Sequence, residues 1–318
     1  MVIMRLMKET HPPSSRARLV RRLRGLRRLR GWHRAAGWLV PADTEGRFLV
    51  RNGSLLFAGD IESYIEREMY LFGDYEGLEI EQFLNVISTS SRRVLLDIGA
   101  NVGTHSLRFA QHFKQVHSFE PNPSLWASFE QNMSLNELHN VILHHVGLGS
   151  EDAELPFYSI ECRNHGLGTF LPEEQYDRPL KLVAHSRIAH GDRYLQARGI
   201  SQVDAIKIDV QGLEPSVLRG LRGTLEASRP AVWFEFGAGT RDSTQSSEPR
   251  AIELRDWFPY EVDLLRLVRI KGPLLAVRLA RTDTVPPLGD YLALPVAAKR
   301  TGGQVTRVAA TAQQPAPL

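Results

Sequence analysis

The sequence has one cysteine, Cys162, among its 318 residues. That excludes an internal disulfide and is typical of proteins in a reducing compartment, so we expect a cytoplasmic protein. Long hydrophobic runs are missing too, since no segment reaches the roughly 20 apolar residues that a membrane-spanning helix needs. Residues 1–16 have neither the continuous apolar core nor the cleavage site of a secretory signal, and they are expected to be unstructured.

Acidic residues are almost absent from the N-terminal end. Residues 1–34 contain one acid, Glu9, and eleven arginines or lysines. The formal net charge of +3 therefore comes from this arm, because the rest of the chain has more acidic than basic residues. The positive charge of this arm therefore gives little indication of which molecules the rest of the chain binds.

Within this arm, Leu19, Leu23 and Leu26 recur at helical spacing between arginines, which predicts a short helix over residues 17–34. One interpretation is a solvated arm, or a helix docked on its own domain. The other is contact with an anionic membrane surface or an acidic partner, and the composition also resembles that of an organellar transit peptide. High charge and weak apolar content predict that the arm adds little to the core.

Two apolar runs flank Asn52-Gly53, which predicts a β-hairpin over residues 47–57 with a type I′ turn. Residues 61–90 are expected to be helical. We interpret this part as a cap over the core rather than an independent domain. The expected organisation is an arm at 1–46, partly disordered with a short helix, a cap at 47–91, a main domain at 92–298 and a disordered tail at 299–318.

From Arg92 onward, short apolar segments alternate with longer helical ones. This alternation predicts an α/β fold with a mostly parallel sheet and helices on both faces. Residues 260–294 are rich in valine and leucine and are expected to supply closing antiparallel strands. The strands of the parallel part are expected near residues 94–96, 116–119, 141–146, 204–209 and 231–236.

The most informative segment is Asp97-Ile98-Gly99-Ala100-Asn101-Val102-Gly103, which follows the first of these strands. Its glycines, four residues apart, allow a sharp bend and close approach to a ligand at the carboxyl edge of the sheet. The segment differs from the dinucleotide fingerprint G-x-G-x-x-G, and its acid would repel a pyrophosphate. A carboxylate instead suits the sulfonium and ammonium groups of S-adenosylmethionine. We therefore expect this cofactor, bound by Asp97, Gly99, Ala100, Asn101 and Gly103.

The second strand ends in Glu120, about twenty residues after the glycine loop. A carboxylate at that position accepts hydrogen bonds from both hydroxyls of a ribose. Alone, Glu120 would be interpreted as a solvated acid at a strand end. Together with the loop, it is expected to be a sixth cofactor-binding residue.

Several segments together resemble the FkbM family of methyltransferases, over about half of the chain. The resemblance implies a Rossmann-like class I methyltransferase fold with a seven-stranded sheet, S-adenosylmethionine as methyl donor, and usually O-methylation of a sugar, polyketide or similar metabolite. The family often has glutamate where this chain has Gln211. The segments are Asp97–Gly103, Glu120-Pro121, Asn132 to Asn136, and Ile206–Glu214 followed by Val217-Leu218.

Asp209 and Glu235 end the fourth and fifth parallel strands and are the candidate catalytic residues. Either can orient an acceptor hydroxyl or take its proton, since methyl transfer needs alignment and removal of one proton. No residue is assigned as a metal ligand, although a Mg²⁺ shared by the two carboxylates is an alternative. His185 and His190 are the next candidates for a base.

Two other functions stay open. An RNA-directed methyltransferase would use the basic arm to hold phosphates, but the chain has Asp209-Val210-Gln211-Gly212 where base-amine methyltransferases tend to have an Asn/Asp-Pro-Pro-aromatic turn. Nucleic acid is therefore not the expected acceptor, and a small molecule is. A non-catalytic scaffold with this fold would not need to keep the cofactor residues.

Overall fold

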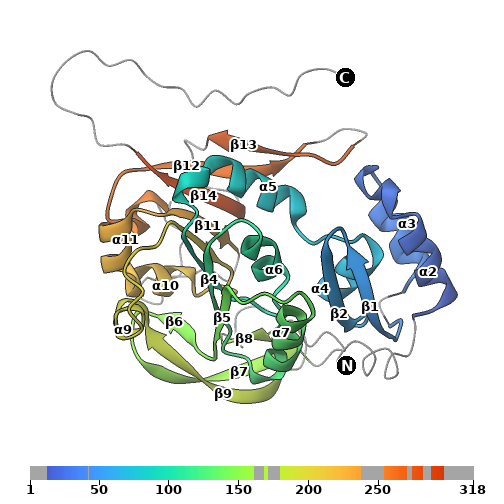
Figure 1. Cartoon of the computed structure of the whole chain (residues 1–318), viewed down its shortest axis with the longest axis horizontal. Helices are drawn as coiled ribbons and strands as arrows, with labels where there is room; N and C mark the ends of the chain where they lie inside the picture. The colour runs from blue at the N-terminus through green and yellow to red at the C-terminus, as the bar shows by residue number, and fades with distance from the viewer. Residues whose placement is uncertain are drawn as a thin grey trace, which may run out of the picture.

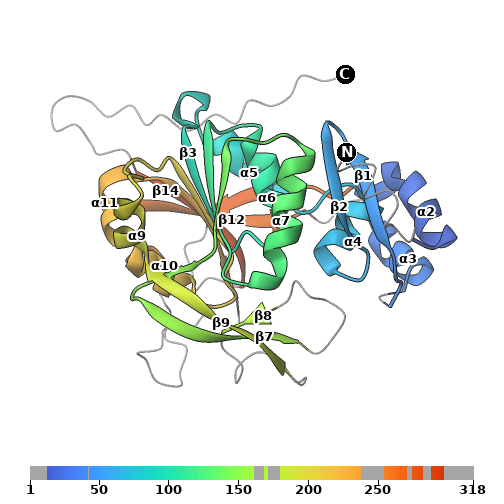
Figure 2. The same cartoon turned by 60° about the horizontal axis from the view of Figure 1, so that its bottom comes forward.

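The computed structural model describes residues 13–41, 43–160, 168–170, 180–237, 254–270, 274–281 and 288–296. Cys162 and the expected C-terminal tail at 299–318 lie outside the described residues. A large twisted sheet forms the centre of the molecule, with helices on both of its faces (Figure 1). A smaller sheet lies to one side of it, and a hairpin with the N-terminal helices lies at one end (Figure 2).

The described part of the large sheet has eight strands in the order β13-β12-β14-β11-β10-β3-β4-β5. Five of them run parallel, and the sequence analysis located all five. The three C-terminal strands are antiparallel, as expected, and β13 extends the expected seven-stranded sheet at its edge. The strands are β3 (Val94–Ile98), β4 (Gln115–Phe119), β5 (Val141–His144), β10 (Ala205–Ile208), β11 (Ala231–Phe236), β12 (Val262–Arg269), β13 (Val277–Arg281) and β14 (Gly289–Pro295).

The chain order of the parallel strands reverses between β3 and β10, which are neighbours in the sheet. At such a point the loops after the two strands diverge to opposite faces and leave a crevice at the carboxyl edge of the sheet. The glycine loop follows β3, and Asp209 follows β10. The topology therefore brings the expected cofactor loop and the expected catalytic carboxylate to the same crevice.

Alternate side chains of the central strands enter two different cores. Leu96 and Ile98 pack with α9 (Gly191–Ala197), α10 (Glu214–Gly220) and α11 (Arg222–Ser228), whereas Leu95 packs with α5 (Gly77–Val86) and α6 (Thr104–Ala110). Because both faces are covered, the strands are apolar throughout, as is typical of parallel sheets. The segment between β10 and β11 forms two short helices, α10 and α11, rather than one. They meet at Gly220, where the backbone of Gly149 comes too close for any Cβ.

A second sheet of four strands, in the order β6-β9-β7-β8, forms between β5 and β10 and was not predicted from the sequence. Its strands are β6 (Gly147–Gly149), β7 (Ala153–Ile160), β8 (Gly168–Thr169) and β9 (Leu180–His190). The first half of β9 is mostly exposed, and only its second half alternates with buried side chains. Period-two alternation, the usual signal of a strand, is therefore weak in this segment.

The hairpin at the N-terminal side of the cap is confirmed. Strands β1 (Arg47–Asn52) and β2 (Leu55–Asp60) pair from Arg47 with Asp60 to Asn52 with Leu55. The two turn residues are therefore Gly53 and Ser54 rather than Asn52 and Gly53. Of the two, Gly53 has the positive φ, +63°, so the expected type I′ turn with two positive φ angles is wrong.

The arm contributes more to the core than its composition predicts. It forms α2 (Ser15–Arg22), a 3₁₀ turn η1 (Arg24–Arg28) and α3 (Trp32–Leu39). Ala17, Val20, Ala36 and Val40 are fully buried against the hairpin and α4 (Tyr64–Leu71). The docked helix, one of the two interpretations of the arm, is therefore the arrangement found, and small side chains make the contact.

Two asparagines connect the hairpin to the main domain. Asn132 on α7 (Pro123–Leu135) accepts a hydrogen bond from the backbone N–H of Ala58 at 2.9 Å and donates to the carbonyl oxygen of Val102 at 3.2 Å. Asn136 accepts from the N–H of Leu56 and donates back to its carbonyl oxygen, both at 2.7 Å. The outer edge of β2 is thereby paired with side chains, which removes an open strand edge. None of the described helices is long and apolar enough to cross a membrane.

Candidate functional site

The glycine loop joins the ends of three strands. The backbone N–H groups of Gly99 and Ala100 both donate to the carbonyl oxygen of Phe119 at 3.0 Å, which connects the loop to β4. Gly99 has a φ of +86°, and a Cβ there would overlap the carbonyl oxygen of Asp209 after β10. Gly103, at φ +85°, begins α6, and a Cβ there would lie 2.6 Å from Cε of Met133 on α7. Both glycines are thus required by contacts within the protein.

Glu120 holds the outside of this loop. One of its carboxylate oxygens, Oε2, accepts the N–H of Asn101 at 2.8 Å, and the other, Oε1, accepts the N–H of Asn122 at 2.8 Å. Asn101 has a positive φ of +52°, which turns its N–H toward the carboxylate. Each oxygen keeps a further lone pair for a hydroxyl donor. Burial outweighs the two hydrogen bonds and raises the pKa of Glu120 to about 7.

Asp97 at the end of β3 is fully buried. Its Oδ2 accepts the hydroxyl of Ser106 at 2.6 Å, and that hydroxyl lies 2.8 Å from the hydroxyl of Ser118. Its Oδ1 has no hydrogen-bond partner among the described residues. Because buried polar atoms are rarely left unpaired, an unused carboxylate oxygen fits a site for an additional donor, such as an ammonium group. The residues expected to bind S-adenosylmethionine therefore fit that cofactor.

Asp209 follows β10 beside this loop, and its N–H donates to the carbonyl oxygen of Ile98 at 2.9 Å. Oδ2 lies 3.1 Å from Nζ of Lys207, which is buried, and Oδ1 accepts from the side-chain amide of Gln211 at 3.2 Å. Burial favours the neutral acid, but Lys207 outweighs it, so the pKa of Asp209 lies below its ordinary value. Asp209 is thus ionised at neutral pH.

The carboxyl group of Glu235 on β11 has its pKa displaced in the opposite direction to that of Asp209. Glu235 pairs across the sheet with Asp290 on β14. Burial, followed by the charges of Asp209 and Asp290, raises the pKa of Glu235 to about 8. A Glu235 that is mostly protonated at neutral pH can donate a hydrogen bond, whereas the ionised Asp209 can only accept. Two neighbouring carboxyl groups with pKa values displaced in opposite directions have the character of an acid–base pair.

Sequence reasoning missed a second group of polar residues at this end of the sheet. Nε2 of His105 on α6 lies 3.1 Å from Oε2 of Glu76, the residue before α5, and His105 is almost completely buried. Glu76 has a positive φ of +52°, a conformation that costs a non-glycine residue about 1–3 kcal/mol. Burial, then the negative charges of Glu76 and Asp209, raises the pKa of Tyr75. No motif marks Glu76, because it lies in the cap, before the segments with family character.

Asp290 completes the group. Its Oδ1 accepts the indole N–H of Trp233 at 3.1 Å, and burial together with Glu76 raises its pKa to about 7. Burial, together with the negative charges of Asp209 and Glu76, thus raises the pKa values of both Glu235 and Asp290. The cluster can exchange hydrogen bonds with an acceptor that carries several hydroxyl groups.

The motif Asp209–Glu214 also has a structural role that the sequence did not reveal. The carboxylate of Glu214 accepts the N–H groups of Val210 and Gly212 at 3.0 to 3.2 Å. Gln211 and Gly212 between them have φ angles of +55° and +105°. Glu214 therefore fixes the turn in which Gln211 donates to Asp209.

The histidines proposed as alternative bases lie elsewhere. His185 and His190 are both on β9 of the second sheet, and His185 is exposed. The N–H of His190 donates to Asp152 at 3.0 Å. Neither contacts Asp209 within the part of the chain that the structure describes, so nothing supports a role for them in proton transfer.

A Mg²⁺ shared by Asp209 and Glu235 does not fit this arrangement. Among the described residues, no three histidine, cysteine, aspartate or glutamate side chains are placed to hold a metal ion. Lys207 already supplies the positive charge at Asp209, with its ammonium 3.1 Å away. A cation at the same carboxylate would be repelled.

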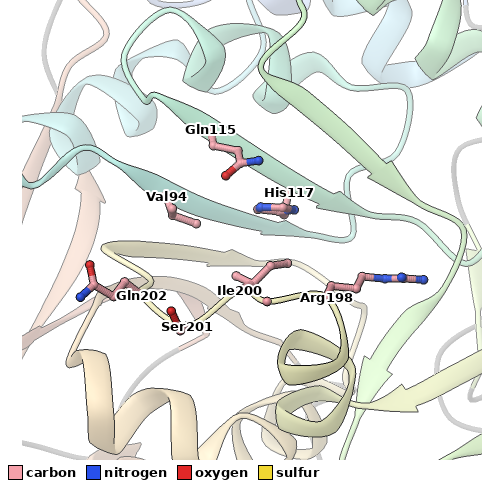
Figure 3. A pocket seen from close by; sticks show the side chains of 8 residues that line it. Val94, Gln115, His117, Arg198, Ile200, Ser201 and Gln202 are labelled. Carbon is pink, nitrogen blue, oxygen red and sulfur yellow. The ribbon is translucent and has the colours of Figure 1, made fainter.

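One cavity lies at the opposite edge of the large sheet. Val94 and Gln115, the first residues of β3 and β4, line it together with His117, Arg198 and Gln202 (Figure 3). Because the glycine loop follows the other ends of these strands, this cavity is separate from the candidate site. Behind it, Nδ1 of His117 lies 2.9 Å from Nε2 of His144, and both rings are buried.

Comparison with known proteins agrees with the geometry. The methyltransferase FkbM domain matches residues 97–263, more than half of the chain. The chain belongs to the FkbM methyltransferase family. The matched range begins at Asp97 and contains the glycine loop, Glu120, Asp209 and Glu235. It excludes the arm and the cap, including Glu76.

Curated methyltransferases share about three residues in ten with this chain over the matched segments. Methyltransferase 1 of Beauveria bassiana is 29% identical over 146 residues, or 40% of this chain and 57% of the relative. Hexuronic acid methyltransferase AglP of Haloferax volcanii is 27% identical, over 48% of this chain and 60% of the relative. 2-O-methyltransferase NoeI of Sinorhizobium fredii is 30% identical, over 43% of this chain and 60% of the relative. The matches span about six-tenths of the length of these relatives.

Solved structures of methyltransferases also match the chain. The crystal structure of methyltransferase FkbM from Methylobacillus flagellatus is 15% identical, with a TM-score of 0.38, over 71% of this chain and 52% of that one. A SAM-dependent methyltransferase from Agrobacterium tumefaciens is 12% identical, with a TM-score of 0.42, over 78% of this chain and 69% of that one.

Proposed function

We propose that this protein transfers the methyl group of S-adenosylmethionine to a hydroxyl group of a small molecule. The observation that carries the proposal is the group of carboxylates at the carboxyl ends of β3, β4 and β10, where the chain order of the parallel strands reverses. Asp97 has a buried carboxylate oxygen without a partner among the described residues, Glu120 holds the glycine loop, and Asp209 is ionised. Membership of the FkbM family supports the same reaction class.

The cofactor supplies an electrophilic methyl group when it is bound. Asp97 would attract its ammonium and sulfonium charges, and Glu120 would accept hydrogen bonds from its ribose hydroxyls. Gly99, Ala100, Asn101 and Gly103 would surround it with backbone. Asn101 serves this role indirectly, since its N–H holds Glu120 in place.

Asp209 would accept the proton of the acceptor hydroxyl. Its pKa is low, so it is a weak base, but it is ionised and held by Lys207 and Gln211. Glu235, protonated at neutral pH, would donate a hydrogen bond to a neighbouring oxygen of the acceptor. Orientation by this pair accounts for much of what methyl transfer needs from a protein.

A sugar, polyketide or similar polyhydroxylated metabolite suits the site. Carboxyl groups that both donate and accept are typical partners of vicinal hydroxyls. The names of AglP and NoeI, a hexuronic acid methyltransferase and a 2-O-methyltransferase, favour a sugar among these acceptors. A single cysteine supports a cytoplasmic, reducing environment for the reaction.

The test is transfer of radiolabelled methyl groups from S-adenosylmethionine to a panel of hexuronic acids, neutral sugars and polyketides, with and without EDTA. Methylation of any member that Asp209→Asn abolishes and Glu226→Gln leaves intact supports the proposal. Glu226 is a suitable control because it is a half-exposed carboxylate on α11. If the protein binds the cofactor but methylates no compound in the panel, the result would favour a non-catalytic scaffold. Methyl transfer to RNA would favour the RNA-directed methyltransferase.

Residues 17–34 carry a separate proposal, contact with an anionic membrane or an acidic partner. Their arginines support it, and it does not depend on the catalytic assignment.

A further inference from the structure

The helices of the arm bury small side chains and leave most of their large apolar side chains exposed, although Trp32 packs partly against the core. Ala17, Val20, Ala36 and Val40 are fully buried. By contrast, Trp38 is 79% exposed and Leu19 is 50% exposed. We call six outward side chains, each at least 38% exposed, the outer apolar face: Leu19, Leu23, Leu26, Leu29, Trp38 and Leu274.

Most of this face is continuous. Leu19, Leu23 and Leu26 follow one another at i, i+4 and i+7 along α2 and η1. Leu29 forms a β-bridge with Leu274, which adds a residue from a distant part of the chain. Helix α3 lies alongside α2 in both views (Figures 1 and 2), and Trp38 points away from the core because Ala36, two residues earlier, points into it.

The charged side chains of the arm helices themselves are of one sign. Residues 13–41 contain nine arginines and no acidic residue. Six of these arginines are exposed, namely Arg16, Arg18, Arg22, Arg28, Arg30 and Arg34. Two of the others, Arg21 and Arg24, point inward and donate to Asn52 at 3.3 and 3.2 Å, so they hold the arm on the hairpin. The exposed arginines are not needed for that contact.

Leucines and a tryptophan surrounded by arginines match the boundary between lipid headgroups and acyl chains. The apolar side chains enter that boundary, while arginines extend to the phosphates. An anionic leaflet adds attraction for each basic residue near its surface. RNA would account for the arginines but not for the outward leucines and tryptophan. We propose that the outer apolar face docks the protein on an anionic lipid surface, an interaction beyond the proposed methyl transfer and independent of it.

The experiment uses the full chain and sedimentation with vesicles of phosphatidylcholine, alone or with about one-third phosphatidylglycerol. The wild-type protein should bind the anionic vesicles at least about tenfold more tightly, and added salt should weaken the binding. The triple variant Leu19→Gln, Leu23→Gln, Leu26→Gln should bind the anionic vesicles about tenfold or more weakly than the wild type. Leu182→Gln, an equally exposed leucine on β9, should change nothing.

A second variant, Arg22→Gln with Arg28→Gln and Arg30→Gln, tests the charge, and circular dichroism with cofactor binding shows that each variant is folded. The proposal is overturned if the wild-type protein does not bind anionic vesicles, or if the leucine variant binds them as the wild type does. It is also overturned if light scattering shows a dimer that the leucine variant dissociates, since a second copy would then cover the face. Binding to RNA that outcompetes the vesicles and survives the leucine changes would also contradict it.

Discussion

Glu120 is the residue whose replacement tests the cofactor site most directly. Its two oxygens accept the N–H groups of Asn101 and Asn122, each at 2.8 Å. Alanine would leave two buried donors without a partner, each costing about 1–3 kcal/mol of stability. Glu120→Gln is the better change, because its amide keeps one acceptor oxygen and nearly the same volume while it loses the charge.

The expected loss of affinity follows from the hydrogen bonds to the ribose. In the glutamine variant, two charge-assisted hydrogen bonds to the ribose become at most one neutral hydrogen bond. The binding of S-adenosylhomocysteine should therefore weaken by about 1–3 kcal/mol, which is roughly five- to 150-fold in affinity. The pKa of about 7 adds a second signature. If the ligand binds the ionised form, wild-type affinity should rise about tenfold between roughly pH 6 and pH 8, and the glutamine variant should show no such rise.

Titration calorimetry at several pH values measures both effects. Glu66→Gln is a matched control, since Glu66 is a buried carboxyl in the cap whose pKa is also raised to about 7. Its variant should change stability and leave the affinity unchanged. If Glu120→Gln binds S-adenosylhomocysteine as tightly as the wild type, with the same pH dependence, then Glu120 only holds the loop and does not contact the ribose.

Three further predictions concern other parts of the molecule. Asp209→Asn should lower turnover about 10²–10⁴-fold with nearly unchanged cofactor affinity, and normal single-turnover rates in this variant would exclude it as the base. Deletion of residues 1–46 should lower stability by about 3 kcal/mol or more in urea melts, because it removes four fully buried side chains, and an unchanged midpoint would show that the arm is not part of the core. Burial lowers the pKa of His117 and lowers that of His144 to about 4, so the unfolded chain takes up protons first. This pair should then cost about 3 kcal/mol of stability as the pH drops from about 6.5 to 4, whereas buried carboxyl groups with raised pKa values, such as Glu66 and Asp290, change stability in the opposite direction. The test is the difference between the pH profiles of the wild type and a His144→Gln variant, and identical profiles would refute the assignment.

The large sheet was predictable because its strands are short, apolar and separated by helical segments. Its five parallel strands came from that alternation, and the crevice followed from a glycine loop after the first of them. Glu120 was located by spacing alone. These features are local in sequence, so a single chain reveals them.

What could not be predicted depends on contacts between distant segments. Glu76 reaches the crevice only because the cap folds over α6, where His105 meets it. Lys207 lies between two isoleucines of an apolar strand, where no motif predicts an ion pair, yet its ammonium pairs with Asp209 two residues later. The inward side of the arm was not evident either, because its contacts are made by Ala17 and Val20 rather than by the leucines.

The bridge between Leu29 and Leu274 has a consequence for synthesis on the ribosome. The N–H of Leu275 also donates to the carbonyl oxygen of Arg28, so the arm and the β12–β13 hairpin share backbone hydrogen bonds. Arg28 leaves the ribosome about 245 residues before Leu274 does. Such a contact has a large sequence separation and forms late. Until then, this end of the arm lacks its backbone partners and is accessible to chaperones.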